Sequence, residues 1–249
     1  MTATITLSCP TGIIMATDRR CSYRKGIKEY DFEENSDKLY LFSKVPIGVS
    51  CWGAASLDSG TIIDYLETFE KQELENKDDV NSISKKLKKT LEELLPEIKE
   101  SMGLHIAGYC FDGKDNYPQI RHVFREFRLK QGQFVNEDSN REYHNKNGSI
   151  KQFNYDPFIA LYNGDRAIAI AIFSYLHKIY PNKQRIILDK LNLMQCADLA
   201  KLIINLSGEI LNYLTTLDTS VPVKAVKGLM LAEITLKGSK RLDRTYYAK

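Results

Sequence analysis

Apolar and polar residues alternate at the start of the chain. Residues 2–7 alternate between threonine and an apolar side chain, which is the period of a half-buried strand. Residues 10–12 (Pro-Thr-Gly) have the chemistry of a turn, and the apolar run at 13–17 predicts a second, more deeply buried strand. A hairpin of these two strands would bring Asp18 back to the beginning of the chain.

The same patterns predict further strands and helices. The additional strands are expected at 38–42, 46–52, 104–111, 120–129, 156–161, 221–226 and 228–237. The helices are expected at 57–74, 80–102, 164–180 and 193–217. Ser56 is the expected N-cap of the first helix, and Pro96 is expected to kink the second. Residues 19–36 are charged and irregular and predict a loop, and the last eleven residues predict an exposed tail.

The order of these elements predicts the fold class. Strands, two helices, strands, two helices and strands do not follow a βαβ pattern. They fit a layered α+β sandwich with sheets in the middle and a helix pair on each outer face. The sequence has no internal repeat and no linker, so residues 1–249 are expected to form a single domain. Residues 131–155 are expected to form a long exposed excursion, which is a candidate segment for contact with a partner.

The amino-acid composition argues against a nucleic-acid-binding protein and against a membrane protein. Hydrophobic residues make up 43% of the chain and charged residues 27%, as in soluble globular proteins. The formal net charge of only +3 argues against nucleic acid as the main partner. We expect no membrane span and no signal peptide, because the sequence has neither a long apolar run nor a basic leader.

Cysteines, histidines and glycines indicate no metal or cofactor. The five cysteines are scattered without CxxC spacing, which indicates reduced thiols in a cytoplasmic protein. The four histidines fall on different predicted elements without ligand spacing, so no metal site is expected. The glycines form no phosphate-binding motif, and no cofactor is expected.

Thr2 is the candidate nucleophile. If Met1 is removed, Thr2 has a hydroxyl and a free α-amine on one residue, which is a nucleophile with its own base. The small side chain at position 2 suits removal of Met1 by ordinary processing.

Four features in chain order resemble the proteasome β-subunit family of N-terminal nucleophile (Ntn) hydrolases, close to its HslV-type members. Thr2 stands at the start of the first strand, and Asp18 follows the second in MATDRR. Lys38 opens the next strand, and PIGVSCWGAASLD resembles the family's strand into a glycine-alanine turn, with Gly53 at the oxyanion position. PFIALYNGDRAIAIAIF and AVKGLMLAEI match other family segments more weakly.

The resemblance implies a proteasome-like, four-layer αββα sandwich and a role for each matching residue. Thr2 Oγ would attack a carbonyl, and its α-amine would take the proton. Lys38, held as a cation by Asp18, would lower the pKa of the hydroxyl. The Gly53 N–H would stabilise the oxyanion, an interaction typically worth roughly 2.7–4 kcal/mol.

The chain departs from the family at supporting positions. Asn163 stands where the family has a serine, and Glu209 and Asn212 stand where it has an aspartate and a serine on the last helix. An amide can donate or accept a hydrogen bond but cannot relay a proton as a hydroxyl does. The spacing from Thr2 to Lys38 is also longer than usual, and the charged loop after Arg20 absorbs the difference.

The resemblance predicts a threonine peptidase that cleaves peptide bonds through an acyl-enzyme on Thr2. A transpeptidase or peptide ligase of the connectase type, in which an amine resolves the acyl-enzyme, is one alternative. A non-catalytic proteasome-like scaffold subunit is the other. The expected partners are a peptide or protein substrate and further copies of the chain in a ring or spiral. The sequence does not identify an ATPase partner.

Overall fold

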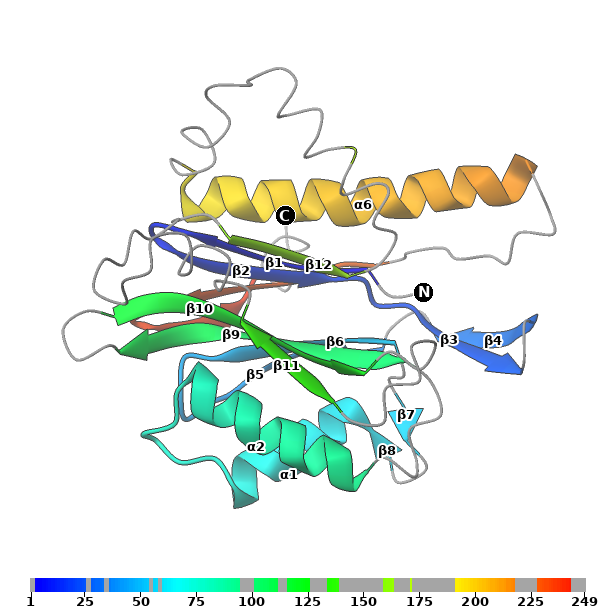
Figure 1. Ribbon diagram of the computed structural model, residues 1–249. Helices are drawn as coiled ribbons and strands as arrows, with labels where there is room; N and C mark the ends of the chain where they lie inside the picture. The colour runs from blue at the N-terminus through cyan, green and yellow to red at the C-terminus, as the bar shows by residue number, and fades with distance from the viewer. Residues whose placement is uncertain are drawn as a thin grey trace.

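The structure is a computed structural model of the 249-residue chain. It describes residues 3–25, 28–33, 36–53, 56–57, 60–94, 101–111, 116–125, 134–138, 159–163, 171, 191–217 and 228–242. Within these ranges the chain forms two five-stranded antiparallel sheets, two small hairpins and three helices (Figure 1).

The first sheet contains the beginning of the chain at its centre. Its strand order is β12 (Ile159–Asn163), β1 (Thr4–Cys9), β2 (Gly12–Thr17), β13 (Met230–Thr235) and β14 (Gly238–Arg241). Every neighbouring pair is antiparallel, and Thr4 of β1 lies opposite both Thr17 and Asn163. The register therefore places the end of β2 beside the start of β1.

The second sheet is stacked on the first. Its strand order is β11 (Val135–Asp138), β10 (Asn116–Arg125), β9 (Met102–Phe111), β6 (Gly48–Gly53) and β5 (Leu39–Leu41). Two hairpins stand apart from both sheets. They pair β3 (Cys21–Lys25) with β4 (Lys28–Glu33), and β7 (Ser56–Leu57) with β8 (Gly60–Thr61).

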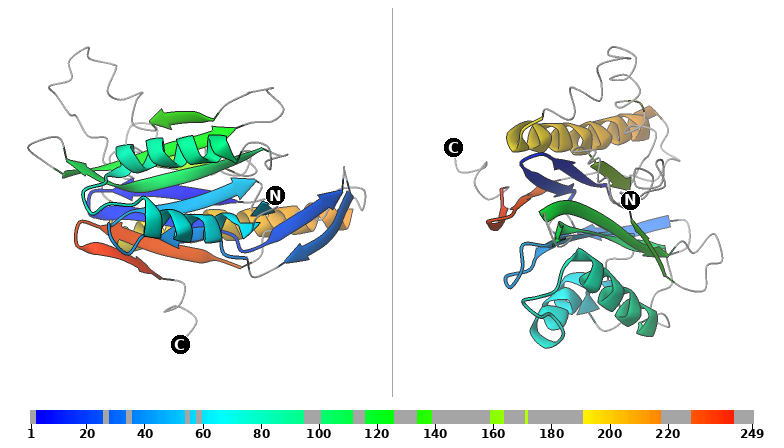
Figure 2. Two further views of the ribbon diagram at one scale, coloured as in Figure 1. Left: turned by 90° about the horizontal axis from the view of Figure 1, so that it is seen from below. Right: turned by 60° about the vertical axis from the view of Figure 1, so that its left-hand side comes forward.

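The helices cover the outer faces of the two sheets. Helices α1 (Ile62–Gln72) and α2 (Val80–Glu93) lie on the second sheet, and α6 (Leu193–Leu217) lies on the first (Figures 1 and 2). Capping boxes begin α1 at Thr61 and α2 at Asp79, where side chain and backbone bond reciprocally. None of the helices in the described ranges is long and apolar enough to cross a membrane.

Apolar side chains fill three interfaces. One cluster packs α1 and α2 against the second sheet, another packs α6 against the first, and a third lies between the sheets. Ala3 and alternate residues of β1 pack in the cluster with α6, namely Ile5, Leu7 and Cys9. The intervening threonines are also buried, since Thr4 and Thr6 bond to residues of the second sheet. The first strand is thus buried on both faces rather than half-buried.

Most of the predicted elements are present. The first two strands, the 38–42 and 46–52 pair, and the strands at 104–111 and 120–129 are confirmed with shifted ends. The predicted helix at 193–217 matches α6 at both ends. The predicted helix at 164–180 lies outside the described residues except for position 171, which is helical. The predicted strand at 221–226 and most of the 131–155 excursion also lie outside them.

Four local predictions were wrong. Residues 19–36 contain the β3–β4 hairpin rather than only a loop. The hairpin was not predicted because charged residues interrupt the apolar alternation in this segment. The first helix begins at Ile62 with Thr61 as its N-cap, whereas Ser56 lies in β7. The helix predicted at 80–102 ends at Glu93, and Met102 already belongs to β9. Part of the expected C-terminal tail forms β14.

Candidate functional site

Asp18 lies directly beside the start of β1. Its backbone N–H donates to the Ala3 carbonyl at 3.0 Å, and the Ala3 N–H donates to Asp18 Oδ1 at 2.9 Å. The Arg20 N–H donates to Asp18 Oδ2 at 3.2 Å. The Asp18 side chain is fully buried. The two hydrogen bonds between Asp18 and Ala3 hold Ala3, the residue that follows Thr2, in position.

Lys38 forms a buried ion pair with Asp18. Lys38 Nζ lies 3.1 Å from Asp18 Oδ1, and the exposed fractions of the two side chains are only 1% and 0%. The same ammonium group donates to the Arg20 carbonyl. The Lys38 backbone is held as well, because its carbonyl accepts from the Cys51 N–H at 2.9 Å on β6. The Lys38 backbone is thus bonded to the second sheet, while its ammonium group lies beside Asp18, at the end of β2 in the first sheet.

The β3–β4 hairpin connects Asp18 and Lys38 in sequence without separating them in space. The Ser36 N–H donates to the Arg19 carbonyl at 2.9 Å, and an Arg19–Asp37 ion pair of 3.3 Å also spans the two ends of this segment. The additional residues between Thr2 and Lys38 therefore project away as a hairpin (Figure 1).

Burial dominates the electrostatics of Asp18. Loss of solvent raises the pKa of its carboxyl above the ordinary value, while the Lys38 cation and the Ala3 N–H lower it. Three donors surround the carboxyl: two backbone N–H groups and the ammonium. This donor set suits the ionised carboxylate and keeps a positive charge beside the chain start.

Gly53 ends β6 in a conformation that only glycine adopts readily. Its φ is +81°, and a Cβ built there would lie 2.0 Å from the Ser101 carbonyl oxygen. A side chain at this position would push β6 away from the start of β9. The glycine therefore allows the backbone at the end of this strand to turn closely over its neighbour.

A polar network joins the two sheets beside this site. Thr4 Oγ1 lies 2.9 Å from Ser50 Oγ, which links β1 to β6. The His105 ring on β9 reaches the first sheet, where Nδ1 lies 3.1 Å from Thr6 Oγ1 and Nε2 lies 2.6 Å from Asn163 Oδ1. With Asn163 as acceptor, the Nε2–H tautomer is assigned from the network, and Thr6 donates to Nδ1. Burial lowers the pKa of His105 to about 4, against the Asn163 hydrogen bond, which raises it.

The structure brings some predicted site residues together and leaves others apart. Asp18 and Lys38 meet, and Asn163 is buried with its amide oxygen bonded to His105. Glu209 is exposed on α6, away from this buried cluster. Thr2 and the side chain of Asn212 lie outside the described residues. The roles of these residues in catalysis stay predictions.

Sequence reasoning missed the His105 network. No spacing rule connects residues 6, 105 and 163, because they meet only when the sheets stack. The alternating threonines of β1 were the available signal, since a polar face on a central strand requires buried partners. Within the described ranges no group of three or more His, Cys, Asp or Glu side chains could hold a metal ion.

Solved structures with a similar architecture are known. No family model and no curated protein matches the chain. Among solved structures, an Anbu (Gly-1) mutant from Hyphomicrobium sp. strain MC1 matches with a TM-score of 0.56 and 13% identity, covering 97% of this chain and 87% of the other. The BPH of Thiobacillus denitrificans in complex with epoxomicin matches with a TM-score of 0.51 and 16% identity, covering 95% and 99%. The fold is proteasome-like.

At these identities the proteasome-like fold is what the comparisons establish. Both similar structures span nearly the whole chain, so the likeness in fold extends over the two sheets and the helices that cover them. What the chain can do chemically follows from its own residues. The Asp18–Lys38 ion pair is buried beside the start of β1, where Asp18 also accepts a hydrogen bond from the Ala3 N–H.

Proposed function

We propose that this chain is an N-terminal threonine peptidase that cleaves peptide bonds through an acyl-enzyme ester on Thr2. The observation that carries the proposal is the hydrogen bond from the Ala3 N–H to Asp18 Oδ1, which also accepts from the buried Lys38 ammonium. Thr2 directly precedes Ala3 in the chain, and this adjacency supports its proposed role as the nucleophile.

Each group has a defined task in the proposed reaction. After removal of Met1, Thr2 Oγ attacks the substrate carbonyl and the α-amine accepts the proton. The Lys38 cation keeps that amine neutral and lowers the pKa of the hydroxyl. Asp18 positions Lys38, and the Gly53 N–H donates to the oxyanion. The amine then returns the proton to the leaving group, and water resolves the ester.

The fold-level comparison supports this assignment. One structure with the same fold was solved in complex with epoxomicin. We propose that the whole chain forms the four-layer αββα sandwich, with residues 164–180 as the second helix beside α6. The layers seen in the described residues are α6, two sheets, and then α1 with α2 (Figure 2).

A peptide-cleavage assay tests the proposed function. We expect the purified chain to hydrolyse members of a fluorogenic peptide library. Thr2→Ala should abolish the activity and Lys38→Ala should reduce it at least about 100-fold, while Thr11→Ala, a change of an exposed threonine, should leave it intact. Wild-type turnover by Thr2→Ala would refute the proposal. An added amine that appears in the product would instead assign transpeptidation on the same acyl-enzyme.

A non-catalytic scaffold is the second candidate. The Asn163 amide cannot relay a proton, and its oxygen is hydrogen-bonded to His105. Glu209 is exposed on α6. These two features favour a chain without peptidase activity. A folded, Met1-free chain that reacts with neither a β-lactone nor an epoxyketone would favour this candidate.

We also propose that the chain associates with further copies of itself through α6. Several large apolar side chains on this helix are exposed, with fractions of 55–66% for Met194, Leu202, Tyr213 and Leu217. An exposed apolar stripe of this kind marks an interaction surface. Light scattering should give a mass above that of the 28.5 kDa monomer, and Leu202→Glu should lower it. A wild-type monomer would refute the association.

A further inference from the structure

Two cysteines that are distant in the sequence belong to one buried cluster. Cys9 ends β1, and Cys196 lies in the first turn of α6. Both thiols are buried in the apolar cluster between the first sheet and that helix, at exposed fractions of 1% and 0%. Neither takes part in the proposed peptidase chemistry, since β1 carries Cys9 to the opposite end of the strand from Ala3.

The packing at the start of α6 explains why the two cysteines meet. Cys9 lies opposite Gly12 in the β1–β2 register. A Cβ at Gly12 would lie 2.8 Å from Leu193 Cδ1, so the missing side chain admits the beginning of the helix. Asn192 and Gln195 bond reciprocally at 3.0 and 2.9 Å and fix where α6 begins. Cys196 follows Leu193 by about one turn and therefore faces the same strand end.

The environment of Cys9 favours its thiolate. Hydrogen bonding from the Cys196 thiol is the largest cause that lowers the pKa of Cys9 to about 6, against burial, which raises it. The same contact raises the pKa of Cys196. Thr11 Oγ1 lies 3.4 Å from Cys9 Sγ and adds a further donor. The arrangement is that of a thiolate next to a protonated thiol, as attack and resolution in disulfide chemistry require.

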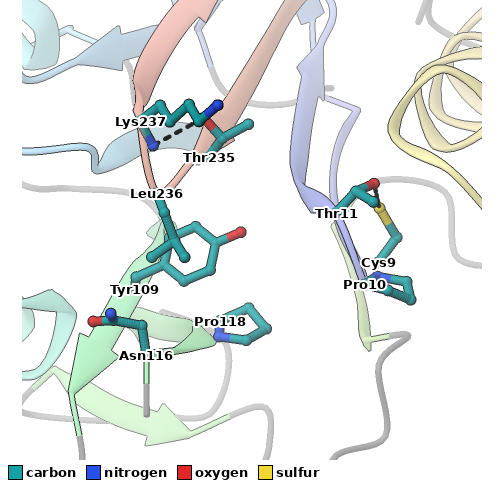
Figure 3. A pocket seen from close by; sticks show the side chains of 9 residues that line it. All are labelled: Cys9, Pro10, Thr11, Tyr109, Asn116, Pro118, Thr235, Leu236 and Lys237. Carbon is teal, nitrogen blue, oxygen red and sulfur yellow. Dashed lines mark hydrogen bonds between the residues drawn. The ribbon is translucent and has the colours of Figure 1, made fainter.

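A path from solvent leads to this strand end. Thr11 is exposed, and its Oγ1 lies 3.4 Å from the buried Cys9 sulfur, so the thiol is in contact with a surface residue. Cys9 and Thr11 also border a cavity of about 500 Å³. Figure 3 shows its opposite wall, formed by Tyr109, Asn116 and Pro118 of β9 and β10, with Leu236 and Lys237 from the β13–β14 turn. Such an opening admits small oxidants more readily than bulky disulfides.

We propose that Cys9 and Cys196 form a dithiol that hydrogen peroxide oxidises to a disulfide. The Cys9 thiolate attacks the peroxide O–O bond, which with one proton gives Cys9 sulfenic acid and water. The Cys196 sulfur then attacks the Cys9 sulfur, its proton leaves with the hydroxyl as a second water, and the S–S bond forms. The peroxide is reduced by two electrons and the two thiols are oxidised. The product covalently joins β1 to α6.

Cys110 provides a matched control. It is buried like Cys9, but its thiol lies 2.7 Å from Gln119 Oε1 and burial raises its pKa to about 12. A protonated thiol of this kind reacts slowly with peroxide.

Thiol labelling after mild peroxide treatment tests the proposal. The reduced chain is treated with one equivalent of hydrogen peroxide, denatured, alkylated and analysed by intact mass and peptide mapping. We expect two of the five thiols to escape alkylation, a mass lower by two hydrogens before alkylation, and a linked peptide pair containing Cys9 and Cys196. Oxidation should also raise the Tm by several degrees, reversibly with dithiothreitol.

Single variants separate the two roles. Cys196→Ser, which keeps a hydroxyl donor beside Cys9, should stop at a Cys9 sulfenic acid that dimedone traps, Cys9→Ala should show no peroxide reaction at Cys196, and Cys110→Ala should behave as the unaltered chain. Five alkylatable thiols after treatment, or a linked pair that excludes Cys9, would overturn the proposal. Because these readouts do not involve Thr2, they are independent of peptidase activity.

Discussion

The buried histidine between the sheets makes stability depend on pH in a calculable way. His105 has its pKa lowered from 6.5 to about 4 because burial disfavours the imidazolium. The folded state therefore keeps the ring neutral while the unfolded chain takes up a proton below pH 6.5. The stabilisation is complete above pH 6.5 and is lost as the pH falls toward 4. Since one pKa unit corresponds to about 1.4 kcal/mol, the full loss is about 3 kcal/mol, of which about 2 kcal/mol is lost by pH 5.

Urea unfolding at a series of pH values between 8 and 4 measures this effect. Other groups titrate in the same range, so the informative quantity is the difference between the unaltered chain and His105→Gln. Glutamine still offers an acceptor to Thr6 and a donor to Asn163, but its amide does not take up a proton between pH 8 and 4. The free energy of unfolding should therefore fall about 2 kcal/mol less for the variant between pH 8 and 5. Parallel pH profiles for the two proteins would refute the reasoning.

Three further predictions concern buried or strained positions, each measured by urea unfolding at pH 7. Lys38→Met leaves the buried carboxylate beside it without a cation and should lower the free energy of unfolding by about 3–5 kcal/mol; an unchanged midpoint would contradict the buried ion pair. Gly53→Ala should cost at least about 2 kcal/mol, because its Cβ would lie 2.0 Å from a backbone oxygen, whereas Gly238→Ala, with positive φ but nothing within 4 Å, should cost only about 1 kcal/mol. Equal costs would show that the close contact is unimportant. Glu70→Ala removes the acceptor of the turn before β6 and should cost about 2 kcal/mol, and a neutral result would contradict that role.

Local patterns predicted the central hairpin and the longest helix. The alternation at 2–7 and the apolar run at 13–17 correspond to β1 and β2, and α6 begins and ends where its periodicity does. The order of elements also predicted sheets in the middle with helices outside, while a helix pair on the outer face of the first sheet stays a prediction. These features are encoded by residues that are close together in the sequence.

Features that depend on competition or on long-range contacts were harder to predict. Ser56 and Thr61 can both cap a helix, but only Thr61 has an acidic partner three residues later, in Asp64. That spacing could have placed the start of α1 correctly. The Asp18–Lys38 pair was expected from a family resemblance, whereas the His105 network arises only when the sheets stack. The threonines of β1 indicate that a polar partner is needed, but local sequence does not identify His105 and Asn163 as the residues that meet there.

The most direct test of the central claim is the intact mass of the purified chain before and after incubation with epoxomicin. The account predicts a mass that lacks Met1 and gains one adduct, with no adduct on Thr2→Ala and full labelling of Thr11→Ala. A chain that retains Met1, or a folded chain without Met1 that stays unlabelled, would contradict a reactive N-terminal threonine.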